Sequence, residues 1–159
     1  MKLNSSAFAE NQPIPVKHTG EGADVSPPLA WQGVPPGTQE FALLCEDPDA
    51  PTPEPWVHWI LYKIPTSVTM LPEGVPPDAK LSSPAGALQG RNSWPSGRAT
   101  GYRGPLPPKG HGTHHYHFRL FALDAPLAPL ATADKASVMK ALQGHVLGEA
   151  TLIGTFERK

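Results

Sequence analysis

The sequence has 159 residues with 13 basic and 14 acidic side chains, which give a formal net charge of −1. This length predicts a single domain over residues 1–159. No stretch holds five like charges, so the charge pattern gives no support for nucleic-acid binding or for binding to an anionic membrane surface. Cys45 is the only cysteine, which excludes an intrachain disulfide and a thiolate metal cage.

The N-terminal region lacks the apolar core of a signal peptide, and no apolar run approaches the length of a membrane span. We therefore expect a cytoplasmic protein without integral membrane association.

Proline is unusually frequent, with 21 residues in 159, or about 13% compared with a usual share of about 5%. The prolines are scattered between apolar runs, so they indicate turns between many short strands rather than disorder. The composition therefore predicts an all-β fold.

The first half of the chain contains three candidate strands. Residues 3–9 are predicted as a short strand, and residues 26–31 are predicted to be extended because prolines restrict the residues before them. Residues 40–45 form a compact apolar run between turn signals, which indicates a buried strand. Cys45 at its end is interpreted as a small buried apolar residue rather than a nucleophile.

An acidic, proline-rich loop follows over residues 46–51. Pro48 and Pro51 leave few backbone conformations open, so the loop is predicted to hold Asp47 and Asp49 in fixed directions. The alternative is a solvated acidic turn without a specific role.

Residues 56–64 form the clearest strand, a β-branched and aromatic run that ends at Pro65. Strict alternation predicts that Trp56, His58, Ile60 and Tyr62 share one face. A histidine in so apolar a strand needs hydrogen-bond partners, and we expect the preceding acidic loop to supply a carboxylate for it. The alternative is a structural histidine.

Residues 65–100 are predicted to be mostly loop that walls one side of a pocket or makes a subunit contact. Beyond them, glycines and prolines shape residues 102–113 into a loop that enters a strand beginning at His114. Alternation places His114 and Tyr116 on one face of this strand. Imidazole, phenol and free loop amides together predict an anion-binding cradle, and a tight connection with a half-buried histidine is the alternative.

The C-terminal part predicts a helix over residues 134–143 and a last strand over residues 149–156. His115 and His117 lie on the opposite face from His114 and could bind zinc, but no further strong ligand is close in sequence. We therefore predict no metal and no cofactor. No Gly-x-Ser-x-Gly motif is present for nucleophilic catalysis.

Three stretches in this order resemble the phosphatidylethanolamine-binding protein family, and more specifically its bacterial and archaeal Raf-kinase-inhibitor-like branch. They are Asp-Pro-Asp-Ala-Pro at 47–51, Trp-Val-His-Trp at 56–59, and the loop and strand over 104–116 with His-His-Tyr at its end. Further likeness at 26–31, 34–38 and 144–150 extends the resemblance over nearly the whole chain.

The resemblance implies an antiparallel Greek-key β-sandwich with one or two short peripheral helices. It also implies a non-enzymatic binding protein with a small pocket for phosphate-like anions or phospholipid headgroups, a kinase or protease as regulated partner, and a homodimer. Carried over residue by residue, the pocket would be formed by Asp47, Pro51, Trp56, His58, Pro108, His114 and Tyr116.

Electrostatics adds a mechanism to this resemblance. An anion beside Asp47 would be repelled, so we expect Asp47 to orient His58 or His114 and to favour its charged form, while the imidazolium and the Tyr116 hydroxyl face the ligand. Two other hypotheses remain. One is an inhibitor that acts through its loop surface with a vestigial pocket, and the other is a histidine-dependent hydrolase or metalloenzyme.

Overall fold

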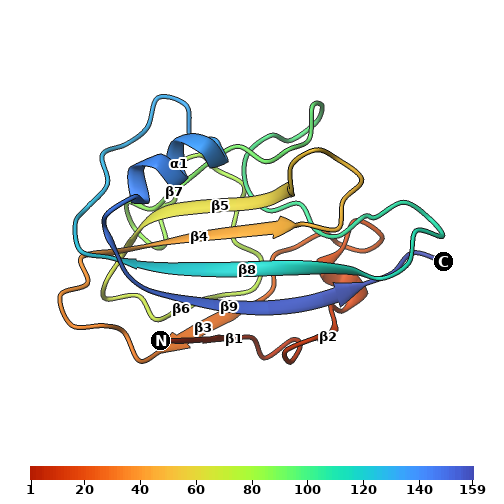
Figure 1. Cartoon of the computed structure of the whole chain (residues 1–159), viewed down its shortest axis with the longest axis horizontal. Helices are drawn as coiled ribbons and strands as arrows, with labels where there is room; N and C mark the ends of the chain where they lie inside the picture. The colour runs from red at the N-terminus through yellow and green to blue at the C-terminus, as the bar shows by residue number, and fades with distance from the viewer.

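Two β-sheets packed face to face form the protein, and the computed structural model describes all residues, 1–159. The larger sheet has the strand order β2-β9-β8-β4-β5-β7 and the smaller one the order β1-β3-β6 (Figure 1). The strands are β1 (Lys2–Asn4), β2 (Gln12–Pro13), β3 (Leu29–Gln32), β4 (Glu40–Asp47), β5 (Trp56–Pro65), β6 (Met70–Leu71), β7 (Leu88–Gln89), β8 (His114–Leu123) and β9 (Val146–Phe156).

The predicted β-sandwich is confirmed, with one departure from a purely antiparallel arrangement. Every strand pair is antiparallel except β2 with β9, a two-residue parallel pair at the sheet edge. The chain leaves β5, runs through a long connection and returns as β8 beside β4. This crossover brings the end of β4, the start of β5 and the start of β8 to the same end of the sheet (Figure 1).

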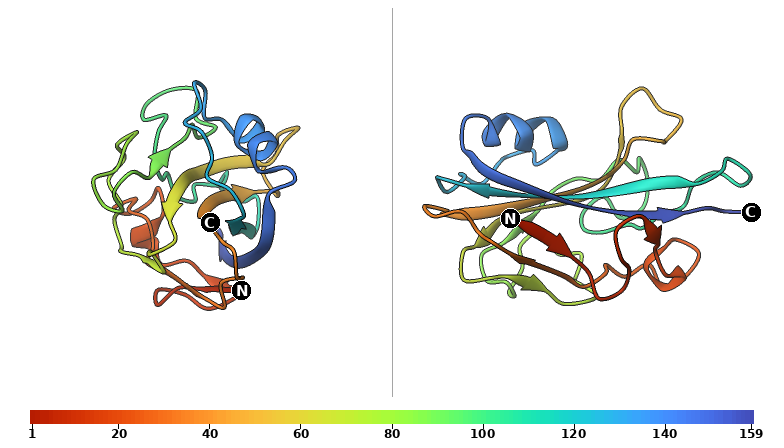
Figure 2. Two further views of the ribbon diagram at one scale, coloured as in Figure 1. Left: turned by 90° about the vertical axis from the view of Figure 1, so that its left-hand side faces the viewer. Right: turned by 60° about the horizontal axis from the view of Figure 1, so that its bottom comes forward.

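Strand β4 is buried along its whole length because both faces of the larger sheet are covered. Phe41, Leu43 and Cys45 belong to the core between the two sheets, and Ala42 and Leu44 belong to a second core on the opposite face. Figure 2 shows the helix and the smaller sheet on opposite sides of the larger sheet. Burial raises the pKa of the Cys45 thiol well above its usual value, which makes this thiol a poor nucleophile.

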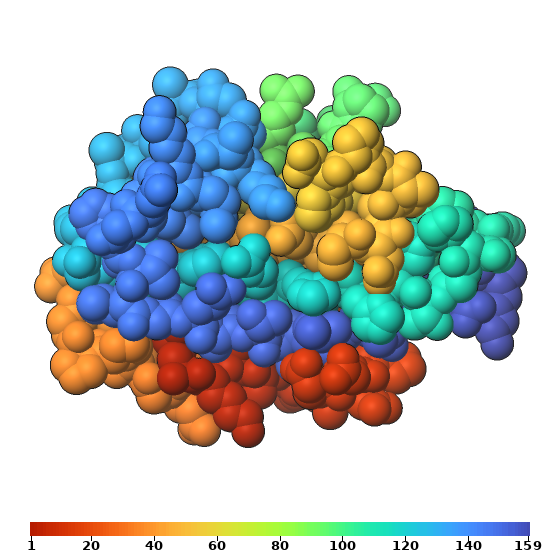
Figure 3. All heavy atoms as spheres, in the orientation of Figure 1, coloured from red at the N-terminus to blue at the C-terminus, as the bar shows by residue number.

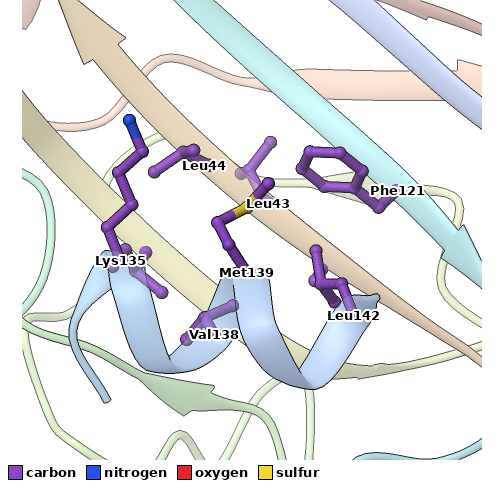
Figure 4. A pocket seen from close by; sticks show the side chains of 9 residues that line it. Leu43, Leu44, Phe121, Lys135, Val138, Met139 and Leu142 are labelled. Carbon is purple, nitrogen blue, oxygen red and sulfur yellow. The ribbon is translucent and has the colours of Figure 1, made fainter. Parts of the chain in front are cut away.

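The predicted helix is confirmed as α1 (Lys135–Leu142), and a single 3-10 turn, η1 (Val16–His18), is the other helical element. The Asp134 side chain accepts a hydrogen bond of 2.9 Å from the Ser137 amide and caps the helix N-terminus. Figure 4 shows Met139 and Leu142 pointing from α1 toward the larger sheet. The cavity left between the helix and the sheet has a volume of only about 10 Å³. No helix in the structure has the length and apolarity needed to span a bilayer.

The prediction that Trp56, His58, Ile60 and Tyr62 share one face of β5 is wrong. Cys45 pairs with Trp59 and Glu46 pairs with Val57, so β5 carries one extra residue, His58, in a β-bulge. A bulge shifts the alternation of side chains by one position. Ile60 and Tyr62 therefore pack beneath α1, whereas His58 contacts Tyr116, which belongs to the core between the sheets.

Element boundaries differ from the prediction at both ends of the chain. The first strand covers Lys2–Asn4 and not the predicted residues 3–9, because residues 5–11 turn toward β2. The last strand begins at Val146 and not at residue 149, and it pairs along all of β8. Residues 66–100 are mostly loop as predicted, with only the short strands β6 and β7.

Candidate functional site

A cavity of about 210 Å³ lies where the end of β4, the start of β5 and the start of β8 meet their loops. Figure 3 shows the segments around residues 50 and 110, gold and teal, side by side on the surface at this end of the molecule. The structure brings all seven predicted site residues to this one cavity. Its full lining consists of Asp47, Ala50, Pro51, Thr52, Trp56, His58, Trp94, Leu106, Pro108, His114 and Tyr116.

Asp47 and His114 form a buried pair at the wall of the cavity. The His114 Nδ1 lies 2.6 Å from the Asp47 Oδ2, and both side chains are at least 95% buried. The other oxygen of Asp47 accepts a bond of 2.8 Å from the Asp49 amide, which fixes the turn of the acidic loop. Of the two histidines that Asp47 was expected to orient, it therefore contacts His114.

The second ring nitrogen of His114 contacts another histidine, His111. The His114 Nε2 lies 2.7 Å from the His111 Nδ1, so Asp47, His114 and His111 form a continuous chain of hydrogen bonds toward the surface. His111 is exposed and sits between Gly110 and Gly112, which have φ angles of +73° and +88°. His111 was not among the predicted site residues, although its spacing of three residues before His114 was a usable signal.

His58 is not paired with a carboxylate, contrary to the prediction. Its Nδ1 donates a hydrogen bond of 2.7 Å to the backbone carbonyl of Arg103, which lies in the loop that precedes β8. Burial lowers the pKa of His58 to about 4, which outweighs this hydrogen bond. The expectation that His58 supplies a charged imidazolium at neutral pH is therefore wrong.

Tyr116 presents a buried hydroxyl without a partner. The residue is 1% exposed, it lines the cavity, and its hydroxyl makes no hydrogen bond within the protein. Its ring lies edge-on to His58, with ring centroids 5.1 Å apart. Burial raises the pKa of Tyr116, so the phenol keeps its proton and stays available as a hydrogen-bond donor.

An aromatic wall borders the cavity on the side of β5. Trp94 lies edge-on to both His58 and Trp56, at centroid distances of 5.0 and 5.5 Å, and the Arg103 guanidinium lies 4.5 Å from its ring centre. Hydrogen bonds from the Val57 amide to Ser93 and from the Trp94 amide to Asn92 hold this segment in place. The sequence predicted that the long connection would wall a pocket but did not single out Trp94.

His115 and His117 lie outside the cavity. The exposed His115 Nδ1 lies 2.7 Å from the Asp49 Oδ2, and its backbone amide donates to the same oxygen. Across residues 1–159, the structure brings together no group of three or more histidine, cysteine, aspartate or glutamate side chains suited to a metal ion.

The fold and the cavity define a β-sandwich protein with a small, partly polar pocket at one end of its central sheet. A family model described as phosphatidylethanolamine-binding protein matches residues 4–157, so the chain belongs to this family. A UPF0098 protein of Methanothermobacter thermautotrophicus is 47% identical over 158 residues, which cover 99% of each chain.

Two solved structures agree with this assignment. YbcL of Escherichia coli, described as a new member of the mammalian PEBP family, has a TM-score of 0.90 and 35% identity over 99% of this chain and 98% of its own. A putative phosphatidylethanolamine-binding protein homologue of Chlamydia trachomatis has a TM-score of 0.85 and 34% identity over 99% of this chain and 97% of its own. Family membership supports a binding role in general terms.

Proposed function

We propose that the protein binds small phosphate-like oxyanions, free or as the headgroup of a phospholipid, in the cavity between β4, β5 and β8, and that it performs no covalent step on them. The observation that carries this proposal is the buried Tyr116 hydroxyl without a partner. A buried donor left unsatisfied costs about 1–3 kcal/mol, and an oxyanion in the cavity would accept its hydrogen bond and remove that cost.

The arrangement of charge supports an anion even though Asp47 lies in the wall. Both carboxylate oxygens of Asp47 already accept hydrogen bonds, one from His114 and one from the Asp49 amide. The carboxylate is therefore directed at the protein, and its charge is compensated by donors within the wall.

The size of the cavity supports a headgroup rather than a whole lipid. Its volume of about 210 Å³ lies below the range of about 300–1,000 Å³ that is typical of pockets for drug-sized ligands. A phosphate ester would fit with its substituent directed out past the aromatic wall.

The lining residues favour binding without catalysis. They include no serine, cysteine or lysine, and the Thr52 hydroxyl donates to the backbone carbonyl of Glu54. The lining therefore lacks the serine or cysteine side chain that a histidine could activate as a nucleophile.

Titration calorimetry with inorganic phosphate and with O-phosphoethanolamine tests this proposal. Wild type should bind, and Tyr116→Phe should bind about 10- to 100-fold more weakly because one hydrogen bond to a charged group is lost. The matched control is Tyr102→Phe, which removes an equally buried hydroxyl that donates to the His18 carbonyl at 2.6 Å, outside the cavity lining.

Vesicles distinguish the two sources of the anion. Co-sedimentation with phosphatidylethanolamine vesicles that free phosphate displaces would indicate the headgroup, whereas binding of soluble anions alone would indicate a free phosphate ester. Failure of wild type to bind any of these probes, or equal binding by Tyr116→Phe, would overturn the proposed function.

A further inference from the structure

Hydrogen bonding fixes which nitrogen of His58 carries the proton. The Arg103 carbonyl can only accept, so the His58 Nδ1 at 2.7 Å must be the donor. The Arg103 amide in turn donates to the His58 carbonyl at 3.1 Å, so the loop is held to β5 by both backbone groups of one residue. In the neutral ring this leaves Nε2 as a lone-pair acceptor.

The side-chain hydrogen bond of His58 is made by Nδ1 and not by Nε2, and the neighbouring Gly104 backbone also lies close enough to the ring to favour its protonated form. The rings of Trp94 and Tyr116 lie edge-on to His58 at 5.0 and 5.1 Å, and the Tyr116 hydroxyl makes no hydrogen bond to it. Burial opposes protonation of this ring. His58 and Tyr116 both line the cavity with their rings edge-on, and they carry an acceptor at Nε2 and an unpaired hydroxyl donor, respectively.

A neutral His114 offers no hydrogen-bonding partner to either His58 or Tyr116. Its Nδ1 proton bonds to Asp47, and its Nε2 faces the His111 Nδ1, which then acts as the donor between the two rings. Asp47, His114 and His111 thus satisfy one another by hydrogen bonds. The acceptor on His58 and the donor on Tyr116 remain for a ligand.

We propose that the pocket selects oxyanions that carry a proton, namely hydrogen phosphate species and phosphate monoesters in their monoanionic form, whose P–OH donates to His58 while a second oxygen accepts from Tyr116. This inference rests on the proposed function and narrows it to free phosphate and phosphate monoesters, because the phosphatidylethanolamine headgroup is a phosphodiester and would be disfavoured together with dimethyl phosphate. A sulfate ion and a phosphodiester have the same tetrahedral shape but no hydroxyl to donate, so each leaves the His58 acceptor unpaired.

The pH dependence has a defined sign. A phosphate monoester loses its second proton with a pKa of about 6, so the binding form declines as the pH rises above this value. Several other groups around His58 also titrate or carry charge, and they are Asp47 on β4, His114 and Tyr116 on β8, and His111 and Arg103 in the preceding loop. Protonation of His111 or His114 would strengthen the binding of every anion, so sulfate at the same pH is the necessary comparison.

The experiment is calorimetric titration of the wild-type protein with methyl phosphate, dimethyl phosphate and sulfate at pH 5.5 and pH 8. Methyl phosphate at pH 5.5 should bind about 10-fold or more tightly than either of the others. At pH 8, titrations in two buffers of different ionisation enthalpy should show uptake of close to one proton per methyl phosphate bound.

His58→Gln provides a second readout, because the amide side chain can donate as well as accept. In this variant the preference for methyl phosphate over sulfate should shrink toward unity. Equal affinity of the wild type for methyl phosphate and sulfate at pH 5.5 would overturn this inference and leave the proposed function standing. Failure of all three anions to bind would overturn both.

Discussion

Glu46 and Asp47 are neighbours on β4, but their carboxylates lie on opposite sides of the larger sheet and have different surroundings. Glu46 points toward α1, where it accepts from the Arg119 Nη1 at 3.1 Å and from Lys135, and Arg119 also bonds Glu149 at 2.9 Å. Asp47 lies on the other side of the sheet, in the wall of the cavity, where its carboxylate bonds His114 and the Asp49 amide and the Tyr116 hydroxyl remains unpaired. Burial of both carboxylates is similar, at 7% and 3% exposure, so burial alone does not separate their roles.

The difference lies in how completely each side is filled and paired. Beneath α1 the remaining space is about 10 Å³ and the buried carboxylate has its partners, whereas the pocket keeps about 210 Å³ and leaves the Tyr116 hydroxyl unpaired. The filled side contributes stability through close packing, and in the proposed function the open side keeps an unpaired hydrogen-bond donor for a ligand. Substitutions on the two sides should therefore separate stability from binding.

The largest effect is expected beneath α1. Leu142→Ala should lower the free energy of unfolding by about 2–5 kcal/mol, because it removes a side chain that is 2% exposed from a nearly void-free core. Denaturant unfolding measures this loss. Phosphate affinity should be unchanged in the folded variant, and a parallel loss of affinity would show that the two sides are not independent.

His58 should make stability depend on pH. Its folded-state pKa of about 4 lies below the ordinary value of 6.5, so the unfolded chain binds more protons between these values. The free energy of unfolding should therefore fall as the pH drops from about 6.5 to 4, by about 3 kcal/mol from this residue.

Unfolding of wild type and His58→Gln across this range isolates the contribution of His58. The difference in stability between the two proteins should change with pH in that window and stay level above pH 7. Parallel curves from pH 7 to pH 4 would contradict the assignment of a neutral, buried His58.

A smaller effect is expected at the N-terminus of α1. Asp134→Ala removes the side-chain acceptor of the Ser137 amide and should cost about 1 kcal/mol. Asp134→Asn keeps a capping oxygen and serves as the control, with most of the stability retained in thermal unfolding. An equal loss in both variants would point to charge rather than capping.

Patterns along the chain predicted most of the fold. The apolar runs at residues 40–45 and 56–64 and the alternation after His114 carry their own strand signals, and they became β4, β5 and β8. The parallel pairing of β2 with β9 was not predictable, because two residues of Gln12–Pro13 carry no periodic signal. It depends on where β9 lies in space.

The site was predictable where it is encoded in motifs. Asp47, His114 and Tyr116 follow from the acidic loop and the histidine-tyrosine strand, and the structure places them around one cavity. The environment of His58 was not predictable, because a β-bulge turns the residue and its partner is a backbone carbonyl 45 positions away. Every residue has a backbone carbonyl, so the amino-acid sequence does not indicate which one will accept the hydrogen bond of His58.

The central claim is that the Tyr116 hydroxyl is held unpaired for a ligand, and unfolding of wild type and Tyr116→Phe with and without phosphate tests it most directly. Without phosphate, Tyr116→Phe should be as stable as wild type or more stable, because it removes an unsatisfied buried group. With phosphate, wild type should gain stability through binding and the variant should gain much less. A variant that is less stable without phosphate and gains as much from it as wild type would contradict the claim.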